Sequence, residues 1–159
     1  FTKVGIISRG FGGSDMNNLL YYSEQLISKH QPRAVVIYEG DNDIANGIDA
    51  VQIAAKFNQV VQKIRLSSPQ LRVYFISIKP SFARWPLWSA MVKANQLIED
   101  ICNKDKNATY IDVASVLLSN GEPLADIFQP DGLHLNAKGY QLWAAAIVTV
   151  VEAGEAQYE

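Results

Sequence analysis

The feature that most constrains the fold is an alternation of short apolar runs and segments with helical spacing. The runs KVGIIS, RAVVIYEG, RVYFISIKP and ATYIDV are rich in β-branched or aromatic residues and are bounded by polar residues, Gly or Pro. Helical spacing of apolar residues predicts helices over 14–29, 49–66, 87–104 and 137–152. Near-continuous apolar strands that alternate with amphipathic helices are typical of a parallel sheet covered on both faces. We therefore expect a three-layer α/β fold.

Length and charge narrow the class of protein. The chain has 159 residues, of which 48% are hydrophobic and 19% charged, so 1–159 is expected to form a single domain. The formal net charge is −2 and no cluster of Lys and Arg stands out, which argues against a nucleic-acid partner. No apolar run reaches the roughly 20 residues that a membrane span needs.

The single cysteine and one of the two histidines are interpreted as structural. Cys102 alone excludes an internal disulfide and a cysteine-based zinc cluster, and we expect it to be buried in the helix over 87–104. His30 lies near the end of the first predicted helix, just before Gln31 and Pro32, where a residue that can carry positive charge is favoured. We assign His30 no catalytic role.

Ligands of open α/β sheets bind outside the carboxyl ends of the strands, so the segments after the strands are the candidates for a site. The first is RGFGGSDMN. Its glycines allow close approach of backbone to a ligand, and a helix that begins after Gly13 would point free N–H groups at an anion. The alternative is a tight turn in which Ser14 is the N-cap.

The second segment, EGDNDIANG, places Asp41, Asn42 and Asp43 directly behind a predicted strand. The side chain of Asn42 can donate a hydrogen bond to a developing oxyanion. Two alternatives stay open. The segment could be an Asx-type turn, or the aspartates could hold a hard cation such as Mg²⁺ or Ca²⁺.

The segment PDGLHLN precedes the last predicted helix and contains the second histidine. Asp131 and His134 are three residues apart around Gly132, so the carboxylate can accept from one imidazole nitrogen while the other nitrogen points outward as a base. This arrangement is the orienting acid and general base of a nucleophilic triad. The alternative is a surface or capping histidine.

The segment SFARWPLW follows the third predicted strand. It presents Arg84, Trp85 and Trp88 near the expected ligand face, where aromatic walls could hold an acyl chain or a sugar ring. The alternative is that both tryptophans pack the following helix.

At these residues the sequence resembles the SGNH hydrolases, also called the GDSL esterase/lipase family, and in particular the branch similar to platelet-activating factor acetylhydrolase. GFGGS matches the family's glycine block at Gly13, GDND matches Gly-x-Asn-Asp with Asn42, and DGLH matches Asp-x-x-His with Asp131 and His134. Three of four blocks are present in family order over nearly the whole chain.

The resemblance implies a flavodoxin-like α/β/α fold and a serine hydrolase of carboxylic esters that needs no metal or cofactor. A serine would attack the ester carbonyl, His134 would act as the base, and Asp131 would orient the imidazole. Gly13 and Asn42 would contribute to the oxyanion hole. A compact member of the family implies a small-molecule substrate with a short acyl group such as acetyl.

The family's fourth block, the nucleophilic serine in Gly-Asp-Ser, is absent from the sequence, and no Gly-x-Ser-x-Gly elbow replaces it. In the family this serine ends the first strand, which runs through the middle of the sheet. KVGIIS would then be the family's second strand, and the central strand would be missing. We therefore expect the natural protein to continue before Phe1 with that strand and its serine; Ser14 is the substitute within the chain.

Two other functions remain open at this point. The chain could be a catalytically inactive binding domain on the same scaffold. Alternatively, Asp41 and Asp43 together with Asp131 and His134 could form a metal-dependent phosphoesterase site.

Overall fold

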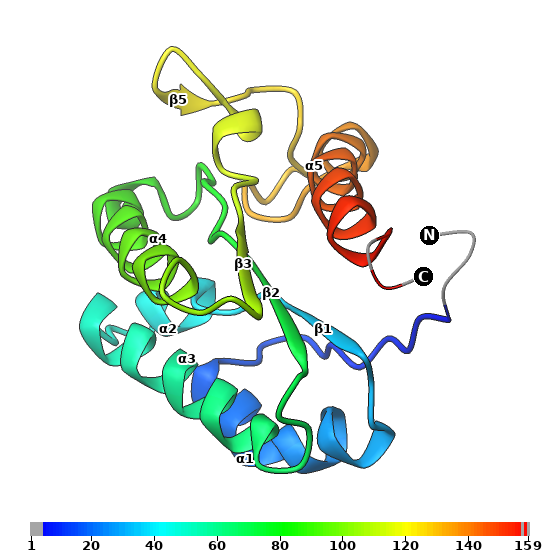
Figure 1. Ribbon diagram of the computed structural model, residues 1–159. Helices are drawn as coiled ribbons and strands as arrows, with labels where there is room; N and C mark the ends of the chain where they lie inside the picture. The colour runs from blue at the N-terminus through cyan, green and yellow to red at the C-terminus, as the bar shows by residue number, and fades with distance from the viewer. Residues whose placement is uncertain (1–4, 157, 159) are drawn as a thin grey trace.

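The computed structural model describes residues 5–156 and 158, which form a three-stranded parallel sheet with helices on both faces (Figure 1). The strands are β1 (Ala34–Ile37), β2 (Arg72–Ile76) and β3 (Ala108–Ile111), in the order β1-β2-β3. They correspond to the predicted runs RAVVIYEG, RVYFISIKP and ATYIDV. The predicted three-layer α/β class is therefore confirmed.

The main helices divide between the two faces of the sheet. They are α1 (Met16–Leu26), α3 (Ala50–Arg65) and α4 (Trp88–Cys102) on one face and α5 (Ala137–Ala156) on the other. Shorter elements complete the described chain: α2 (Asp41–Ala45), the 3₁₀ turns η1 (Ser28–His30), η2 (Trp85–Leu87) and η3 (Ser115–Leu117), and the hairpin of β4 (Leu118–Ser119) and β5 (Glu122–Pro123).

The alternation of side chains along β2 explains the layering. Val73 and Phe75 are buried in the core formed with α1, α3 and α4, whereas Tyr74 and Ile76 are buried in the core against α5. Successive strand residues point to opposite faces, so a strand that is apolar on both faces requires helices on both. Cys102 is buried at the end of α4 as expected, and burial raises the pKa of its thiol to about 12.

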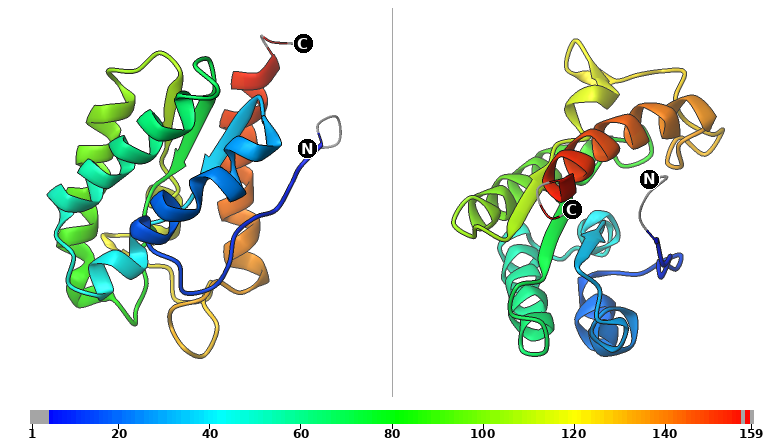
Figure 2. Two further views of the ribbon diagram at one scale, coloured as in Figure 1. Left: turned by 90° about the horizontal axis from the view of Figure 1, so that it is seen from below. Right: turned by 45° about the vertical axis from the view of Figure 1, so that its right-hand side comes forward.

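The predicted strand KVGIIS does not form in the described residues, so this prediction is wrong for 5–8; residues 3 and 4 lie outside the described part. Residues 5–8 have no strand assignment, and Ile6 and Ile7 are 64% and 58% exposed. Figure 2 shows the N-terminal segment running outside the sheet toward α1. An extended segment needs a neighbouring strand to satisfy its N–H and C=O groups, and none lies beside it.

The outer edge of β1 also has no neighbouring strand in the described residues. Within the described residues, β1 pairs only with β2, and Val36 is 44% exposed although it lies in a strand of the sheet. Parallel sheets normally have both faces covered and both edges protected. The sheet thus lacks a strand next to β1, as the sequence comparison with the SGNH pattern predicts.

The N-cap of the first helix lies one residue later than the Ser14 that the sequence suggested. Asp15, not Ser14, is the N-cap of α1: its carboxylate accepts from Asn18 N, and the Asn18 side chain accepts from Asp15 N. This reciprocal capping box satisfies two backbone donors at once, which a lone serine could not do. Asp49 caps α3 through the N–H groups of Val51 and Gln52, as its predicted start requires.

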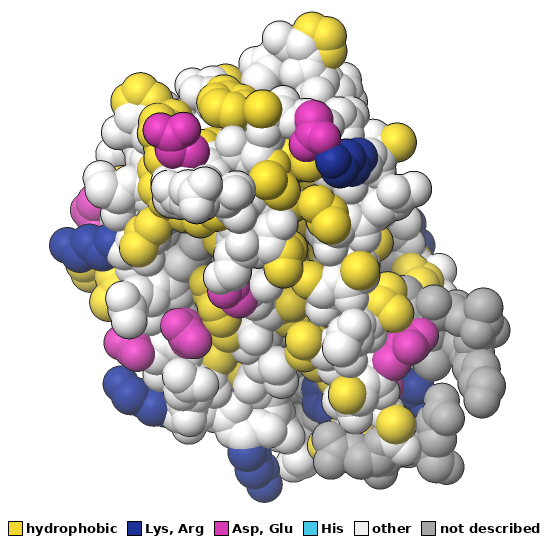
Figure 3. Space-filling model, turned by 90° about the horizontal axis from the view of Figure 1, so that it is seen from above, with side chains coloured by type: hydrophobic (Ala, Val, Ile, Leu, Met, Phe, Trp, Pro, Cys, Tyr) yellow, Lys and Arg dark blue, Asp and Glu magenta, His cyan; other side chains and the backbone are white. Residues whose placement is uncertain are grey.

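The surface carries scattered charge. On the face seen in Figure 3, hydrophobic side chains are interspersed with single Lys, Arg, Asp and Glu side chains. Across the part of the chain that the structure describes, no helix has the length and apolar character needed to cross a bilayer.

Candidate active site

The loop of residues 130–136 meets the carboxyl end of the sheet. Ala83 N, in the loop after β2, donates to Gly132 O at 3.1 Å, and Lys79 Nζ donates to Leu133 O at 2.8 Å. The loop is therefore attached to the segment that follows the central strand of the described sheet, where α/β proteins bind their ligands. Figure 1 shows the loop at this end of the sheet, leading into α5.

Asp131 and His134 form the pair that their spacing predicts. His134 Nδ1 lies 2.6 Å from Asp131 Oδ2, while Asp131 Oδ1 accepts from Leu133 N at 2.9 Å and from His134 N at 3.0 Å. Gly132 allows this tight turn because its φ is +66°, a conformation that L side chains rarely adopt. With Nδ1–H donating to the carboxylate, Nε2 has a free lone pair and can act as a base.

The environment of Asp131 keeps it ionised. Hydrogen bonds from the His134 side chain and from the N–H groups of Leu133 and His134 lower the pKa of Asp131 to about 2. Each of these donors stabilises the negative carboxylate rather than the neutral acid. A carboxylate that remains charged at neutral pH can stabilise an imidazolium beside it.

Asn42 is the second residue of α2, the short helix that begins directly after Gly40. A Cβ on Gly40 would lie 2.6 Å from Ile78 Cδ1, and its φ is +109°, so only glycine fits between β1 and this turn. The Asn42 side chain donates from Nδ2 to Ser14 O at 2.8 Å and accepts at Oδ1 from Arg84 Nη2 at 2.9 Å. One N–H of the amide remains to donate elsewhere. The Asx-type turn that was left open as an alternative is therefore not formed, and the segment is a short helix that the sequence did not predict.

The glycine block is joined to Asn42 by a hydrogen bond, because the Ser14 carbonyl accepts from the Asn42 side chain. Gly13 occupies an exposed turn before α1. The Ser14 hydroxyl donates to Glu39 Oε1 at 2.6 Å and lies 3.1 Å from Phe11 O. The structure thus brings the glycine block and the Asn42 block together, although no strand precedes the glycine block in the described residues.

Glu39, which the sequence analysis passed over, is the group in this region that titrates near neutrality. Burial raises the pKa of Glu39 to about 7; the hydrogen bond from Ser14 lowers it, and the nearby carboxylates of Asp43, Asp15 and Asp41 raise it further. The sequence signal for this residue was its position at the end of an apolar strand run, because folding removes a charged residue at such a position partly from water.

Asp43 has a structural partner. Its carboxylate is buried and accepts from Met16 N at 3.0 Å, which joins α2 to the first turn of α1. Burial raises the pKa of Asp43, and the Met16 hydrogen bond opposes this effect. The carboxylate therefore anchors the glycine block against the Asn42 block.

Lys79 and Arg84 converge on the carboxylate of Asp41. Arg84 Nη1 donates to Asp41 Oδ1, Lys79 Nζ lies 3.7 Å from Asp41 Oδ2, and Tyr38 OH donates to Oδ2 at 3.3 Å. Lys79 was not predicted as a site residue. The available signal was its position directly after an apolar strand run, because a lysine that is buried there needs partners for its charge. Burial lowers the pKa of Lys79, and Asp41 opposes this effect.

Trp85 and Trp88 stack on each other. Their ring centroids are 5.8 Å apart with an angle of 15° between the planes, and both side chains are half-buried. Trp88 packs on the core of α1, α3 and α4, so the packing interpretation holds for this residue. Arg84, the third residue of the predicted substrate wall, directs its guanidinium to Asp41 and Asn42.

The aspartates considered for a metal site are engaged elsewhere. Asp41 pairs with two cations and Asp43 accepts from backbone. Within residues 5–156 and 158, no group of three or more His, Cys, Asp and Glu side chains is arranged to hold a metal ion. The residues present therefore do not fit the predicted metal alternative.

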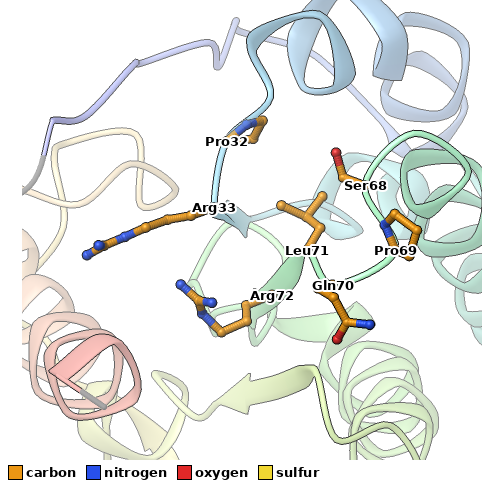
Figure 4. A pocket seen from close by; sticks show the side chains of 7 residues that line it. All are labelled: Pro32, Arg33, Ser68, Pro69, Gln70, Leu71 and Arg72. Atoms are coloured by element: carbon orange, nitrogen blue, oxygen red, sulfur yellow. The ribbon is translucent and has the colours of Figure 1, made fainter. Parts of the chain in front are cut away.

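Two surface pockets lie away from the Asp131–His134 pair. One, of about 320 Å³, is at the amino end of β1 and β2 (Figure 4) and is lined by Pro32, Arg33, Ser68, Pro69, Gln70, Leu71 and Arg72. The other, of about 230 Å³, lies between α4 and the region after β3. Neither includes a residue of the predicted triad or oxyanion hole.

Comparison with known proteins identifies the type of domain. A family model described as the GDSL-like lipase/acylhydrolase family matches residues 2–142. A comparison of the sequence with curated proteins finds no match.

Solved structures share the fold at low sequence identity. A Streptococcus pneumonia protein provisionally described as a platelet activating factor has a TM-score of 0.83 and 18% identity, over 94% of this chain and 73% of that one. A GDSL-like lipase from Bacteroides thetaiotaomicron has a TM-score of 0.75 and 20% identity, over 92% and 75%. A catalytic mutant of an acetylxylan esterase from Geobacillus stearothermophilus has a TM-score of 0.75 and 16% identity, over 90% and 70%.

Proposed function

The chain belongs to the GDSL-like lipase/acylhydrolase family and is a carboxylic ester hydrolase, and from this premise we propose that it cleaves short acyl esters through a Ser-His-Asp triad. The observation that carries the proposal is the 2.6 Å contact between His134 Nδ1 and Asp131 Oδ2. It fixes the imidazole with Nε2 outward, which is the orientation a general base requires.

The steps follow from these positions. The serine hydroxyl attacks the ester carbonyl while His134 Nε2 takes its proton, giving a tetrahedral oxyanion and an imidazolium. His134 then returns the proton to the leaving alcohol, and the acyl-serine remains. A water molecule, deprotonated by the same imidazole, releases the acid and restores the serine. Asp131 holds the imidazole tautomer and stabilises the imidazolium.

The serine of this proposal lies in chain that precedes Phe1. The open edge of β1 supports this placement, because a strand beside it would cover Val36 and would end level with Gly40 and Asn42. Ile6 and Ile7 are also apolar and exposed, which supports a missing neighbour. Ser14 is less suited to this triad, since its hydroxyl donates to Glu39 and not to the imidazole of His134.

The oxyanion hole of the proposal uses three donors: Gly13 N–H, the Asn42 amide and the N–H of the serine. The orientation of the Asn42 amide supports this role. Its Oδ1 accepts from Arg84, so its NH₂ group faces the glycine block. Donors from separate segments can together stabilise the charge that develops only in the transition state.

The proposed substrate is a small ester with a short acyl group, acetyl first. The stacked tryptophans support an acyl or sugar wall beside the site, because Arg84, the residue before Trp85, contacts Asn42. Acetylxylan and family 3 carbohydrate esterases are among the proteins of the same fold, which makes acetylated sugars the natural second substrate to test.

The experiment is labelling with a fluorophosphonate, followed by peptide mass spectrometry, on protein expressed from the complete gene. The proposal expects one serine adduct on a peptide before Phe1, hydrolysis of p-nitrophenyl acetate, and loss of both in His134→Ala. An adduct on Ser14 would show that the nucleophile is Ser14 and not a residue before Phe1. Hydrolysis that survives in His134→Ala would refute the triad.

A further inference from the structure

The carboxylate of Asp41 lies between the two segments that carry the proposed machinery. Its partners Arg84 and Lys79 come from the loop after β2, and the three side chains are 13%, 18% and 10% exposed. Charges this well buried are costly to desolvate, and replacement by apolar groups is often neutral or stabilising. Stability alone therefore gives little reason for two cations on one carboxylate here.

Each cation also reaches one of the proposed catalytic segments. Arg84 Nη2 donates to Asn42 Oδ1 at 2.9 Å, and Lys79 Nζ donates to Leu133 O at 2.8 Å, one residue before His134. Leu133 N in turn donates to Asp131 Oδ1 at 2.9 Å. A continuous set of polar contacts thus links the Asn42 amide with the Asp131–His134 pair.

We propose that Arg84 and Lys79, held together by Asp41, are positioning residues that set the orientation of the Asn42 amide and the place of the Asp131–His134 loop. The inference rests on the proposed function of Asn42 and His134. It goes beyond that function by assigning a role in turnover to two side chains that do not touch the reacting atoms.

Donor chemistry explains why cations serve this purpose. A guanidinium has five N–H donors and no acceptor, so Asn42 must turn its oxygen toward Arg84 and its NH₂ group away. A neutral partner could accept from Asn42 Nδ2 and would allow the amide to flip. Likewise, the Lys79 ammonium can only donate, so it holds the Leu133 carbonyl inward while Leu133 N–H faces Asp131.

Arg84 also has a competing interpretation as a ligand of the substrate. The two roles differ in kinetics. Loss of a group that binds the substrate equally in ground and transition states raises KM, whereas loss of a group that aims an oxyanion donor lowers kcat. Misplacement of a catalytic group by about 1 Å can cost about 10²-fold in rate.

The test compares Arg84→Met and Lys79→Met with wild type, in protein expressed from the complete gene, on p-nitrophenyl acetate. We expect kcat to fall by about 10-fold to 10²-fold in each variant, with KM changed by less than about twofold. Arg84→Lys should recover only part of kcat, because an ammonium cannot hold Asp41 and Asn42 with a planar fork.

Arg65→Met is the matched control. Arg65, the last residue of α3, pairs with Asp105; its side chain is 18% exposed like that of Arg84, and it also donates to backbone carbonyls. Loss of this pair should lower the unfolding temperature and leave kcat unchanged. A general loosening of the fold would instead lower kcat in all three Met variants.

A double variant separates positioning from other effects. In the Asn42→Ala background, Arg84→Met should change kcat by less than about twofold, because the amide that it aims is already gone. Multiplicative losses would overturn the role assigned to Arg84. If either Met variant does not fold, Arg84→Lys and Lys79→Arg are measured in the same backgrounds, and unchanged kcat in both overturns the proposal.

The outcomes distinguish this inference from the proposed function. If His134→Ala and Asn42→Ala lose activity while Arg84→Met and Lys79→Met keep wild-type kcat, the triad stands and the positioning role is wrong. If His134→Ala retains activity, the proposed function fails and the positioning role fails with it.

Discussion

His134 Nδ1 and Asp131 Oδ2 lie 2.6 Å apart, and the Asp131 carboxylate also accepts two backbone N–H groups from the turn that carries the histidine. The Asp131 side chain thus stabilises the turn and also orients the imidazole. Because these donors lower the pKa of Asp131 to about 2, its carboxylate is negatively charged at neutral pH.

Asp131→Asn should lower kcat by about 10⁴-fold while the fold is kept. Asparagine can still accept from the backbone N–H groups through its oxygen, but its NH₂ group, if turned to the imidazole, favours the wrong tautomer. Steady-state kinetics and circular dichroism measure the two parts of this prediction. His30→Ala is the control and should be fully active; a loss below about tenfold in Asp131→Asn would contradict the triad.

Asn42→Ala should lower kcat by about 10²-fold to 10³-fold, the usual loss of one oxyanion-hole donor. Asn42→Asp is the sharper variant, because it keeps an acceptor for Arg84 and removes the donor. Asn107→Ala, at the opposite end of the sheet, should leave kcat unchanged. Full turnover in Asn42→Asp would show that the amide is not an oxyanion donor.

Glu39→Gln should change how stability depends on pH. Burial raises the pKa of Glu39 from an ordinary 4.5 to about 7, so the folded state binds a proton that the unfolded state has lost. Its contribution is therefore fully present below about pH 4.5 and is lost as pH rises through about 7. Glutamine can still accept from Ser14 and cannot ionise.

Urea unfolding at pH 4.5 and pH 8 measures this effect. We expect equal stability of wild type and Glu39→Gln at the lower pH, and a more stable variant at the higher pH. Glu24→Gln, on the exposed surface of α1, is the control and should show the wild-type pH dependence. A variant that loses stability equally at both values would contradict the raised pKa.

Trp85→Ala should raise KM for p-nitrophenyl acetate by about tenfold or less and leave kcat within about threefold, because a wall contacts substrate and transition state alike. Trp143→Phe, on α5 and packed against the core beneath that helix, tests for a general effect of losing an indole. If kcat falls while KM is unchanged, Trp85 does not act as a binding wall.

Glu155→Ala should destabilise the fold by about 3 kcal/mol without changing kcat. Glu155, near the end of α5, accepts from Arg72 Nε at 2.7 Å and from Tyr74 OH at 2.8 Å, and Arg72 is 14% exposed. Removal of the acid leaves a nearly buried guanidinium without its main partner. The free energy of unfolding in urea at pH 7 measures the loss, and a change below about 1 kcal/mol would indicate that water replaces the carboxylate.

The alternation of apolar runs and helical spacing was enough to predict the α/β class, three of the strands and the four long helices, because period and burial are local properties of sequence. Motif spacing likewise predicted the Asp131–His134 pair, since three residues around a glycine leave few ways to fold. KVGIIS shows the limit: its strand pattern is as good as that of RVYFISIKP, but a strand forms only where a neighbour completes its hydrogen bonds.

The sequence by itself thus determined the class of fold, the family and the segments that face the site. Only the tertiary structure decided which polar groups meet: Asp41 with Arg84 and Lys79, Asn42 with the Ser14 carbonyl, and Glu39 with the Ser14 hydroxyl. These partners lie 25 to 43 residues apart in sequence. No periodicity encodes such contacts, because they depend on how the loops of separate strands converge at one edge of the sheet.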